Sequence, residues 1–304
     1  MFRKRLEEFL FPVRSDAWIA VLRFGVGLQV TIYAFSLWRD WNYLFSANRE
    51  GVISRELTEA ILNLQSPFIP RLGWIVTTGQ WVGLSEDTTL ALAWGCLLCS
   101  GCFLLAGFLC RPAAVTAWVL HLAAAGSGGF ITYGVDSFMT IALFYLAIAP
   151  LPDRYSVDAR LRGRRLNAAY RIGFHQRVLQ LHLCLIYFFG GLAKSLGAGW
   201  WDGTSMWRAL TRPPFNIVDP HLLLQWSYLF PVAGISVCAL ELLYPVLIWP
   251  KQTRTIWLAS ILTMHIGIGM LMGLYSFAMI MIILNAAAFG ADLIPQVSKT
   301  IHAE

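Results

Sequence analysis

The chain has 304 residues, of which 57% are hydrophobic and 13% are charged, and its mean hydropathy is +0.60. Soluble domains carry roughly 25% charged residues, so this composition excludes a soluble domain and predicts an all-α, polytopic membrane protein. The net charge of +6 would suit a nucleic-acid partner if the basic residues gathered on one solvated face. They lie between apolar runs instead, which argues against nucleic acid.

Positive charges at the N-terminus precede a long apolar run, and no small-residue cleavage site follows that run. This order is typical of an uncleaved cytoplasmic segment rather than a signal peptide. Residues 2–11 predict a short amphipathic helix on the inner membrane surface, which Pro12 ends.

About eight apolar runs approach the roughly 20 residues that a helix needs to cross a bilayer. We place them at 17–37, 90–109, 113 to the glycines at 126–129, 138–151, 178–196, 231–249, 256–272 and 274–289. The last two runs have almost no loop between them. Residues 1–289 therefore form one predicted transmembrane bundle, and residues 290–304 form a short cytoplasmic tail.

The polar stretch at residues 38–89 contains four tryptophans and two prolines. Tryptophan concentrates where membrane meets water, so this stretch is predicted to be an outer, interfacial segment. With the N-terminus inside, 15 of the 23 Lys and Arg residues lie in inner segments and two lie within apolar runs; the outer six are Arg39, Arg49, Arg55, Arg71, Arg208 and Arg212. This asymmetry predicts that both termini are cytoplasmic.

Lys194 and Arg23 are the two cations embedded in apolar runs, where an ionisable residue marks a candidate functional site. Lys194 lies near a helix end, so it either snorkels to the interface or acts on a ligand. Arg23 either has such a role or forms a structural pair with Glu241 or Asp136. Glu241 itself must be partnered, protonated or functional, since an unpaired buried carboxylate is costly.

Histidine and cysteine give weaker signals. His121 and His265 lie in apolar runs without a metal-binding spacing, which favours hydrogen-bonded core residues over metal or haem ligands. Three cysteines recur every third residue on one helix face, yet no fourth ligand is indicated, so we expect packing and no metal; they are Cys96, Cys99 and Cys102. No phosphate loop, nucleophile elbow or dinucleotide fingerprint follows a strand, which sets soluble enzyme classes aside.

Four stretches resemble the HTTM group, the membrane domain shared by vitamin K-dependent gamma-carboxylase and many bacterial proteins. They are VLRFGVG at 21–27, RYSVDARL at 154–161, GLAKSLGAGWWDGTSM at 191–206 and MHIGIGM at 264–270. They follow the family order across most of the chain. The resemblance implies a protein of the bacterial cytoplasmic (inner) membrane, in contact with membrane lipids, with a quinone or another lipid-soluble cofactor.

Two positions differ from the carboxylase. By its spacing to the tryptophan, Lys194 matches the first of two adjacent family lysines, and Ser195 stands where the second, the base of that enzyme, is found. Asp136 stands where the carboxylase has a histidine. A hydroxyl without an adjacent base cannot replace an amine, so we do not expect glutamate carboxylation.

Two functions remain open. One is a quinol- or lipid-cofactor-dependent enzyme acting at the outer face, with Lys194 as base or electrophile, covered by residues 38–89. The other is a non-catalytic partner that binds lipid or helps an exported protein or peptide mature, as described for some HTTM members. A transporter is less favoured, because no inverted repeat is evident. The candidate catalytic residues are Lys194 and Asp202, and the candidate cofactor-binding residues are Arg23, Asp136, Trp200, Trp201 and His265.

Overall fold

The computed structural model describes residues 2–47, 53–161 and 169–291, and this part of the chain is helical without a β-strand. The all-α prediction is therefore confirmed. A helix occupies each predicted apolar run: α2 (Ala17–Ser36), α6 (Glu86–Ala106), α7 (Cys110–Gly128), α8 (Gly134–Ile148), α10 (Ala169–Ser195), α14 (Phe230–Leu247), α15 (Lys251–Met272) and α16 (Tyr275–Asn285), the last continuing into a π-helical turn over Ala286–Gly290.

Five helices in the described residues, α2, α6, α10, α14 and α15, are long and apolar enough to cross a membrane. α8 and α16 are apolar but shorter. Large hydrophobic side chains are exposed along these helices, including Phe24 and Phe35 on α2 and Ile266 and Met270 on α15. Apolar side chains at such density on an outer surface are typical of contact with lipid. The fold is that of an integral membrane protein.

Local sequence explains where the helices begin and end. α6 starts four residues before the predicted run because the Ser85 side chain accepts a hydrogen bond from the Thr88 N–H, at the helix N-terminus. α15 ends at Gly273, whose φ of +70° is open to glycine at no steric cost. That single residue reverses the chain into α16, which accounts for the missing loop between the last two runs.

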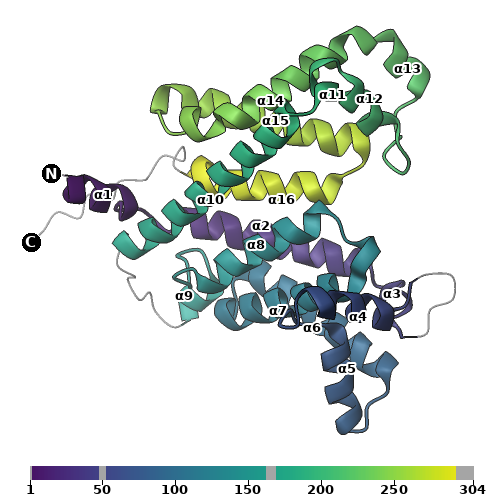
Figure 1. The fold of residues 1–304 in the computed structure, drawn as a ribbon. Helices are drawn as coiled ribbons and strands as arrows, with labels where there is room; N and C mark the ends of the chain where they lie inside the picture. Colours follow the sequence, from purple (N-terminus) through teal and green to yellow (C-terminus); the bar gives the residue numbers. More distant parts are fainter. Residues whose placement is uncertain (1, 48–52, 162–168, 292–304) are drawn as a thin grey trace, which may run out of the picture.

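The long helices form two groups with α16 between them (Figure 1). α2, α6, α7 and α8 pack together in one group, and α10, α14 and α15 form the other. α16 contacts α2 and α8 on one side and α15 on the other, and its π-helical end also reaches α10. Residues of α16 therefore lie between the two groups.

Short helices make up much of the connections. α1 (Phe2–Leu10), the predicted N-terminal amphipathic helix, packs on α10, and α9 (Val157–Leu161) follows α8. α3 (Trp41–Phe45), α4 (Arg55–Gln65) and α5 (Leu72–Trp81) precede α6. α11 (Ala198–Trp201) and α12 (Thr204–Thr211) pack on α14, and α13 (Pro220–Gln225) follows them.

The segment at 38–89 packs on the first group of helices. α3, α4 and α5 lie against α6 and α7, on the opposite side of the molecule from α11–α13 in Figure 1. Trp41 is buried and donates from Nε1 to the Leu90 carbonyl at 2.9 Å, whereas Trp38 and Trp81 are exposed. The expectation that this segment covers Lys194 is therefore wrong for the described residues.

Two sequence predictions concern residues without a described structure. The cytoplasmic tail falls on residues 292–304 apart from Gly290 and Ala291, which extend the last helix. Arg162, Arg164 and Arg165, which contribute to the predicted orientation, also lie outside the described residues.

The cysteines of α6 correct another prediction. Cys96, Cys99 and Cys102 are exposed on the helix surface rather than packed inside. A face of small side chains that meets lipid satisfies the same apolar pattern as a face that meets the core, so the sequence pattern alone could not separate the two.

Candidate functional site

Arg23 on α2 belongs to a closed polar cluster. Its Nε donates to Asp153 Oδ2 at 2.6 Å and its Nη2 to Oδ1 at 3.3 Å, while Nη1 donates to the Leu104 and Leu105 carbonyls. The two side chains are 4% and 0% exposed. The predicted partners Glu241 and Asp136 were thus wrong: Asp153, in the loop after α8, neutralises Arg23.

The RYSVDARL stretch supplies the rest of this cluster. Arg154 pairs with Asp16, at the start of α2. Asp158 accepts from the backbone N–H groups of Leu109 at 3.0 Å and Cys110 at 2.8 Å. These donors lie at the N-terminus of α7, where the helix itself supplies no acceptor for them. The motif therefore ties three helices together, and its charges are used in doing so.

Asp136 lies near the start of α8, where its Oδ2 accepts from the Tyr133 N–H at 2.9 Å. Its backbone carbonyl bonds to His121 Nε2 at 3.1 Å, so His121 is the hydrogen-bonded core histidine that was expected. Asp136 lines a cavity of about 240 Å³ together with Tyr33, Thr132 and other residues. This cavity is separate from the one at Lys194.

Lys194, in the last turn of α10, pairs with Glu241 in the middle of α14. Lys194 Nζ donates to Glu241 Oε2 at 2.6 Å, and the side chains are 28% and 9% exposed. Gly191, one turn before Lys194, makes the contact possible. A Cβ there would lie 2.7 Å from the Leu242 nitrogen and 2.9 Å from the Glu241 Cβ. Glycine thus permits α10 and α14 to approach closely enough for the pair to form.

The ion pair lies in the wall of a cavity of about 370 Å³. Helices α10, α11, α12, α14, α15 and the start of α16 line this partly open cavity. Its lining is mostly apolar, and its polar members are Lys194, Glu241 and His265. The lining residues are Lys194, Trp200, Met206, Ala209, Leu210, Val237, Glu241, Met264, His265, Gly267, Ile268, Leu271, Met272, Leu274 and Phe277. An apolar cavity with a few convergent polar groups is the usual form of a small-molecule site.

A hydrogen-bond chain fixes the tautomer of His265. The Asn285 amide nitrogen donates to the Met281 carbonyl at 2.8 Å and to the Tyr187 hydroxyl at 2.7 Å, and its oxygen accepts from Tyr244 at 2.7 Å. Tyr187 must then donate its own proton to His265 Nε2, which lies 2.8 Å away. The proton of the neutral imidazole is therefore on Nδ1.

That Nδ1–H is a buried donor without a partner among the described residues, although His265 is only 3% exposed. Leaving a buried donor unsatisfied costs about 1–3 kcal/mol, and six other buried side-chain atoms of the described residues, His121 Nδ1 among them, also lack a partner. His265 therefore lines the cavity and keeps a buried ring nitrogen that no group in the described residues uses.

The loop after α10 contributes Trp200 but neither of its neighbours. Lys194 Nζ lies 5.7 Å from the Trp200 ring centroid, within range of a cation–π contact. Trp201 is half-exposed and donates from Nε1 to the Ser195 carbonyl at 2.8 Å. Asp202 Oδ1 accepts from the Thr204 N–H at 2.8 Å, and this hydrogen bond lowers the pKa of the exposed carboxyl. Asp202 lines a shallow hollow with Trp207 and Phe230 instead.

The structure thus gathers three of the seven candidate residues, Lys194, Trp200 and His265, at one cavity, whereas Arg23, Asp136, Trp201 and Asp202 lie elsewhere. It adds Glu241, which the sequence marked as a buried acid but assigned to Arg23. A signal for the pairing was present: Lys194 and Glu241 are opposite charges in two apolar runs, each beside small residues that permit close helix contact.

Metal chemistry has no evident location, since no group of three His, Cys, Asp or Glu side chains could hold an ion within the described residues. In the described residues, fold and site together define a helical integral membrane protein with a mostly apolar, ligand-sized cavity between its helices.

A family model, the HTTM domain, matches residues 79–292, and the chain belongs to this family. The matched range covers the 154–161, 191–206 and 264–270 motifs, and begins after the 21–27 motif. Comparisons with curated proteins and with solved structures give no match.

Proposed function

We propose that the cavity at Lys194 binds a lipid-soluble cofactor with a flat, oxygen-bearing head, such as a quinone, and that the protein is a membrane enzyme using it. The observation that carries this proposal is that one mostly apolar cavity is lined by an ion pair and by His265, whose buried Nδ1 has no partner among the described residues. A carbonyl oxygen of the head would accept from His265, and the ring would lie near Trp200.

The ion pair divides the chemical roles between its two members. Lys194 donates to the Glu241 carboxylate at 2.6 Å, and in this scheme it acts as an electrostatic and hydrogen-bond donor to a developing oxyanion. Glu241 is then the group that takes a proton from a quinol hydroxyl. Ser195, whose hydroxyl donates to the Gly191 carbonyl at 2.8 Å, has no part in this scheme.

We place this site at the outer face of a bacterial inner membrane, with both termini cytoplasmic. Support for this orientation comes from the distribution of Lys and Arg along the chain, in which 15 of 23 fall on one side. In this orientation the Lys194 end of α10 faces out, and the Arg23 cluster lies near the inner surface.

Equilibrium dialysis of the purified protein against a short-tailed quinone tests the proposal. We expect saturable binding that weakens about tenfold or more in His265→Phe, which removes the Nδ1–H donor, and in Lys194→Ala. Ser195→Ala is the matched control, because Ser195 adjoins Lys194 without lining the cavity, and it should bind like the wild type. No saturable quinone binding by the wild-type protein, or equal binding by all variants, would refute the proposal.

The alternative is a non-catalytic partner that helps an exported protein or peptide mature. The observation in its favour is a row of exposed apolar side chains on α13 and the turn that follows, where Leu222, Leu224, Trp226 and Tyr228 are each at least 50% exposed. A stoichiometric protein recovered with the wild type but lost with Trp226→Ala and Tyr228→Ala would favour this function over the enzyme.

A further inference from the structure

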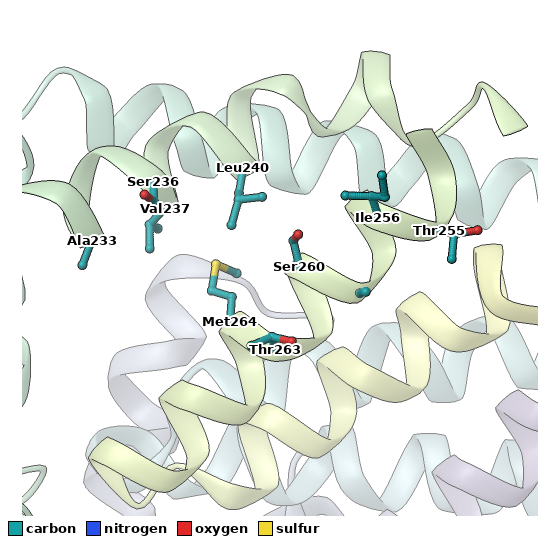
Figure 2. Close-up of a pocket in the computed structure, with 10 residues that line it drawn as sticks. Ala233, Ser236, Val237, Leu240, Thr255, Ile256, Ser260, Thr263 and Met264 are labelled. Atoms are coloured by element: carbon teal, nitrogen blue, oxygen red, sulfur yellow. The ribbon is translucent and has the colours of Figure 1, made fainter. Parts of the chain in front are cut away.

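A groove runs along the outside of the molecule between α14 and α15 (Figure 2). Its volume is about 690 Å³, and it is open along its length. Ala233, Ser236 and Leu240 line it from α14, and Ala259, Ser260 and Thr263 from α15. The surface that the groove presents is predominantly apolar, and it lies between two helices that are long and apolar enough to cross a membrane.

The groove and the Lys194 cavity share two residues, Val237 and Met264. In Figure 2 these side chains extend toward one another across the space between the helices. Both are close in sequence to a polar residue of the site. Met264 directly precedes His265, and Val237 lies four residues, about one helical turn, before Glu241. The cavity and the groove therefore adjoin at these two side chains.

Met264 is the more flexible of the two shared side chains. Methionine is unbranched and has three rotatable bonds, so the Met264 side chain can adopt another rotamer at low cost. The helices themselves are tied nearby, since Trp257 Nε1 on α15 donates to the Leu240 carbonyl on α14 at 3.1 Å. A fixed helix pair with a flexible side chain between them is suited to a lateral opening from the bilayer.

Size also indicates that the cavity needs an outlet. Its volume of about 370 Å³ is at the small end of the roughly 300–1,000 Å³ typical of ligand sites. A ring with its substituents fits such a space, whereas a chain of several isoprene units does not. A lipid-soluble ligand held by its head at His265 must therefore send its tail out of the cavity.

We propose that the α14–α15 groove holds the apolar tail of the ligand whose head occupies the Lys194 cavity, and that the ligand arrives from the bilayer between Val237 and Met264. This inference rests on the proposed function and specifies its ligand as a long-tailed, membrane-dissolved molecule. The tail is stabilised in the groove by van der Waals packing and not by removal from water, because lipid is as apolar as the groove.

The test compares two quinones with the same head, one bearing four isoprene units and one bearing a methyl group. Ala259→Trp fills the groove without touching the cavity, and Ile266→Trp, at an exposed position of α15 that lines neither space, is its control. We expect Ala259→Trp to weaken binding of the long-tailed quinone at least fivefold and to leave the methyl quinone unchanged. Ile266→Trp should alter neither dissociation constant.

The remaining outcomes would refute either the placement of the tail in the groove or the proposed function itself. Equal effects of Ala259→Trp on both quinones, or on neither, would refute the placement of the tail while the head site stands. Loss of a co-purified protein with unchanged quinone binding would assign the groove to a partner helix. Failure of the wild type to bind either quinone would refute the proposed function and this inference with it. Ala259→Leu, a smaller change expected to give a weaker effect in the same direction, guards against misfolding of the tryptophan variant.

Discussion

The two cations within the apolar helices belong to regions of different construction. At Arg23, the guanidinium and the carboxylate of Asp153 are nearly inaccessible, and three guanidinium nitrogens meet fixed protein acceptors. At Lys194, the ammonium is 28% exposed and pairs with Glu241 in the wall of a cavity. Beside it, His265 keeps a buried donor unused.

The difference shows that an embedded charge by itself does not define a ligand site. Both cations are equally conspicuous in the sequence, and both are neutralised by an acid. A ligand, however, needs space and a group with spare hydrogen-bonding capacity, and within the described residues these coincide at the Lys194 region. The Arg23 region holds α2 to the loop after α8, and we infer that it serves the fold.

The contrast between the two regions predicts that Asp153→Asn lowers the free energy of unfolding the most. This change leaves the Arg23 charge buried without its counter-ion, and losing one member of a buried pair costs about 3–5 kcal/mol. Denaturant unfolding in detergent would measure the loss. Glu7→Gln, which removes the exposed Arg3–Glu7 pair, is the control and should change the unfolding free energy by less than about 1 kcal/mol. Wild-type stability of Asp153→Asn would contradict a structural role for the Arg23 region.

Glu241→Gln should have a smaller effect on stability and a larger one on ligand binding. Because Lys194 is partly exposed, its ammonium reaches water when the partner is lost, and we expect a cost of about 1–2 kcal/mol, between those of exposed and buried pairs. Paired unfolding and quinone-binding measurements would check this. The double variant Lys194→Met with Glu241→Leu should regain most of the stability but none of the binding. A loss as large as that of Asp153→Asn would erase the contrast between the two regions.

Hydrophobic patterning predicted a helix at each apolar run, because a backbone in a membrane has to satisfy its hydrogen bonds internally, but five of the eight predicted crossings have helices in the described residues that are long and apolar enough to span. The α15–α16 boundary was the least secure of the predicted boundaries, and the structure places it at Gly273, the left-handed residue at the helix end. The observed helix ends differ from the predicted ones where side-chain capping extends a helix beyond its apolar part, as Ser85 does for α6.

Charge pairing could not be predicted in the same way. Arg23 and Asp153 are 130 positions apart, and Lys194 and Glu241 are 47 apart, so neither pair leaves a local pattern. The expected partners of Arg23 were acids inside apolar runs, yet Asp153 follows the predicted end of its run by two residues. Which charges meet depends on which helices pack together, and small residues such as Gly191 decide that without any charge of their own.

We expect Asp202→Asn to have the smallest effect on quinone binding. Asp202 was a candidate catalytic residue from sequence, but its carboxylate accepts from the Thr204 N–H outside the cavity, so quinone binding should stay within twofold of the wild type. The Thr204 hydrogen bond lowers the pKa of Asp202, so its support of the loop is present above the unfolded-state pKa and is lost as pH falls through the lower folded-state value. Thermal unfolding of the wild type and of Asp202→Asn between neutral and acidic pH would show the difference in their stability shrinking at low pH.

A tenfold loss of quinone binding in Asp202→Asn at neutral pH would instead bring Asp202 into the site, and the Lys194 cavity would no longer account for binding by itself.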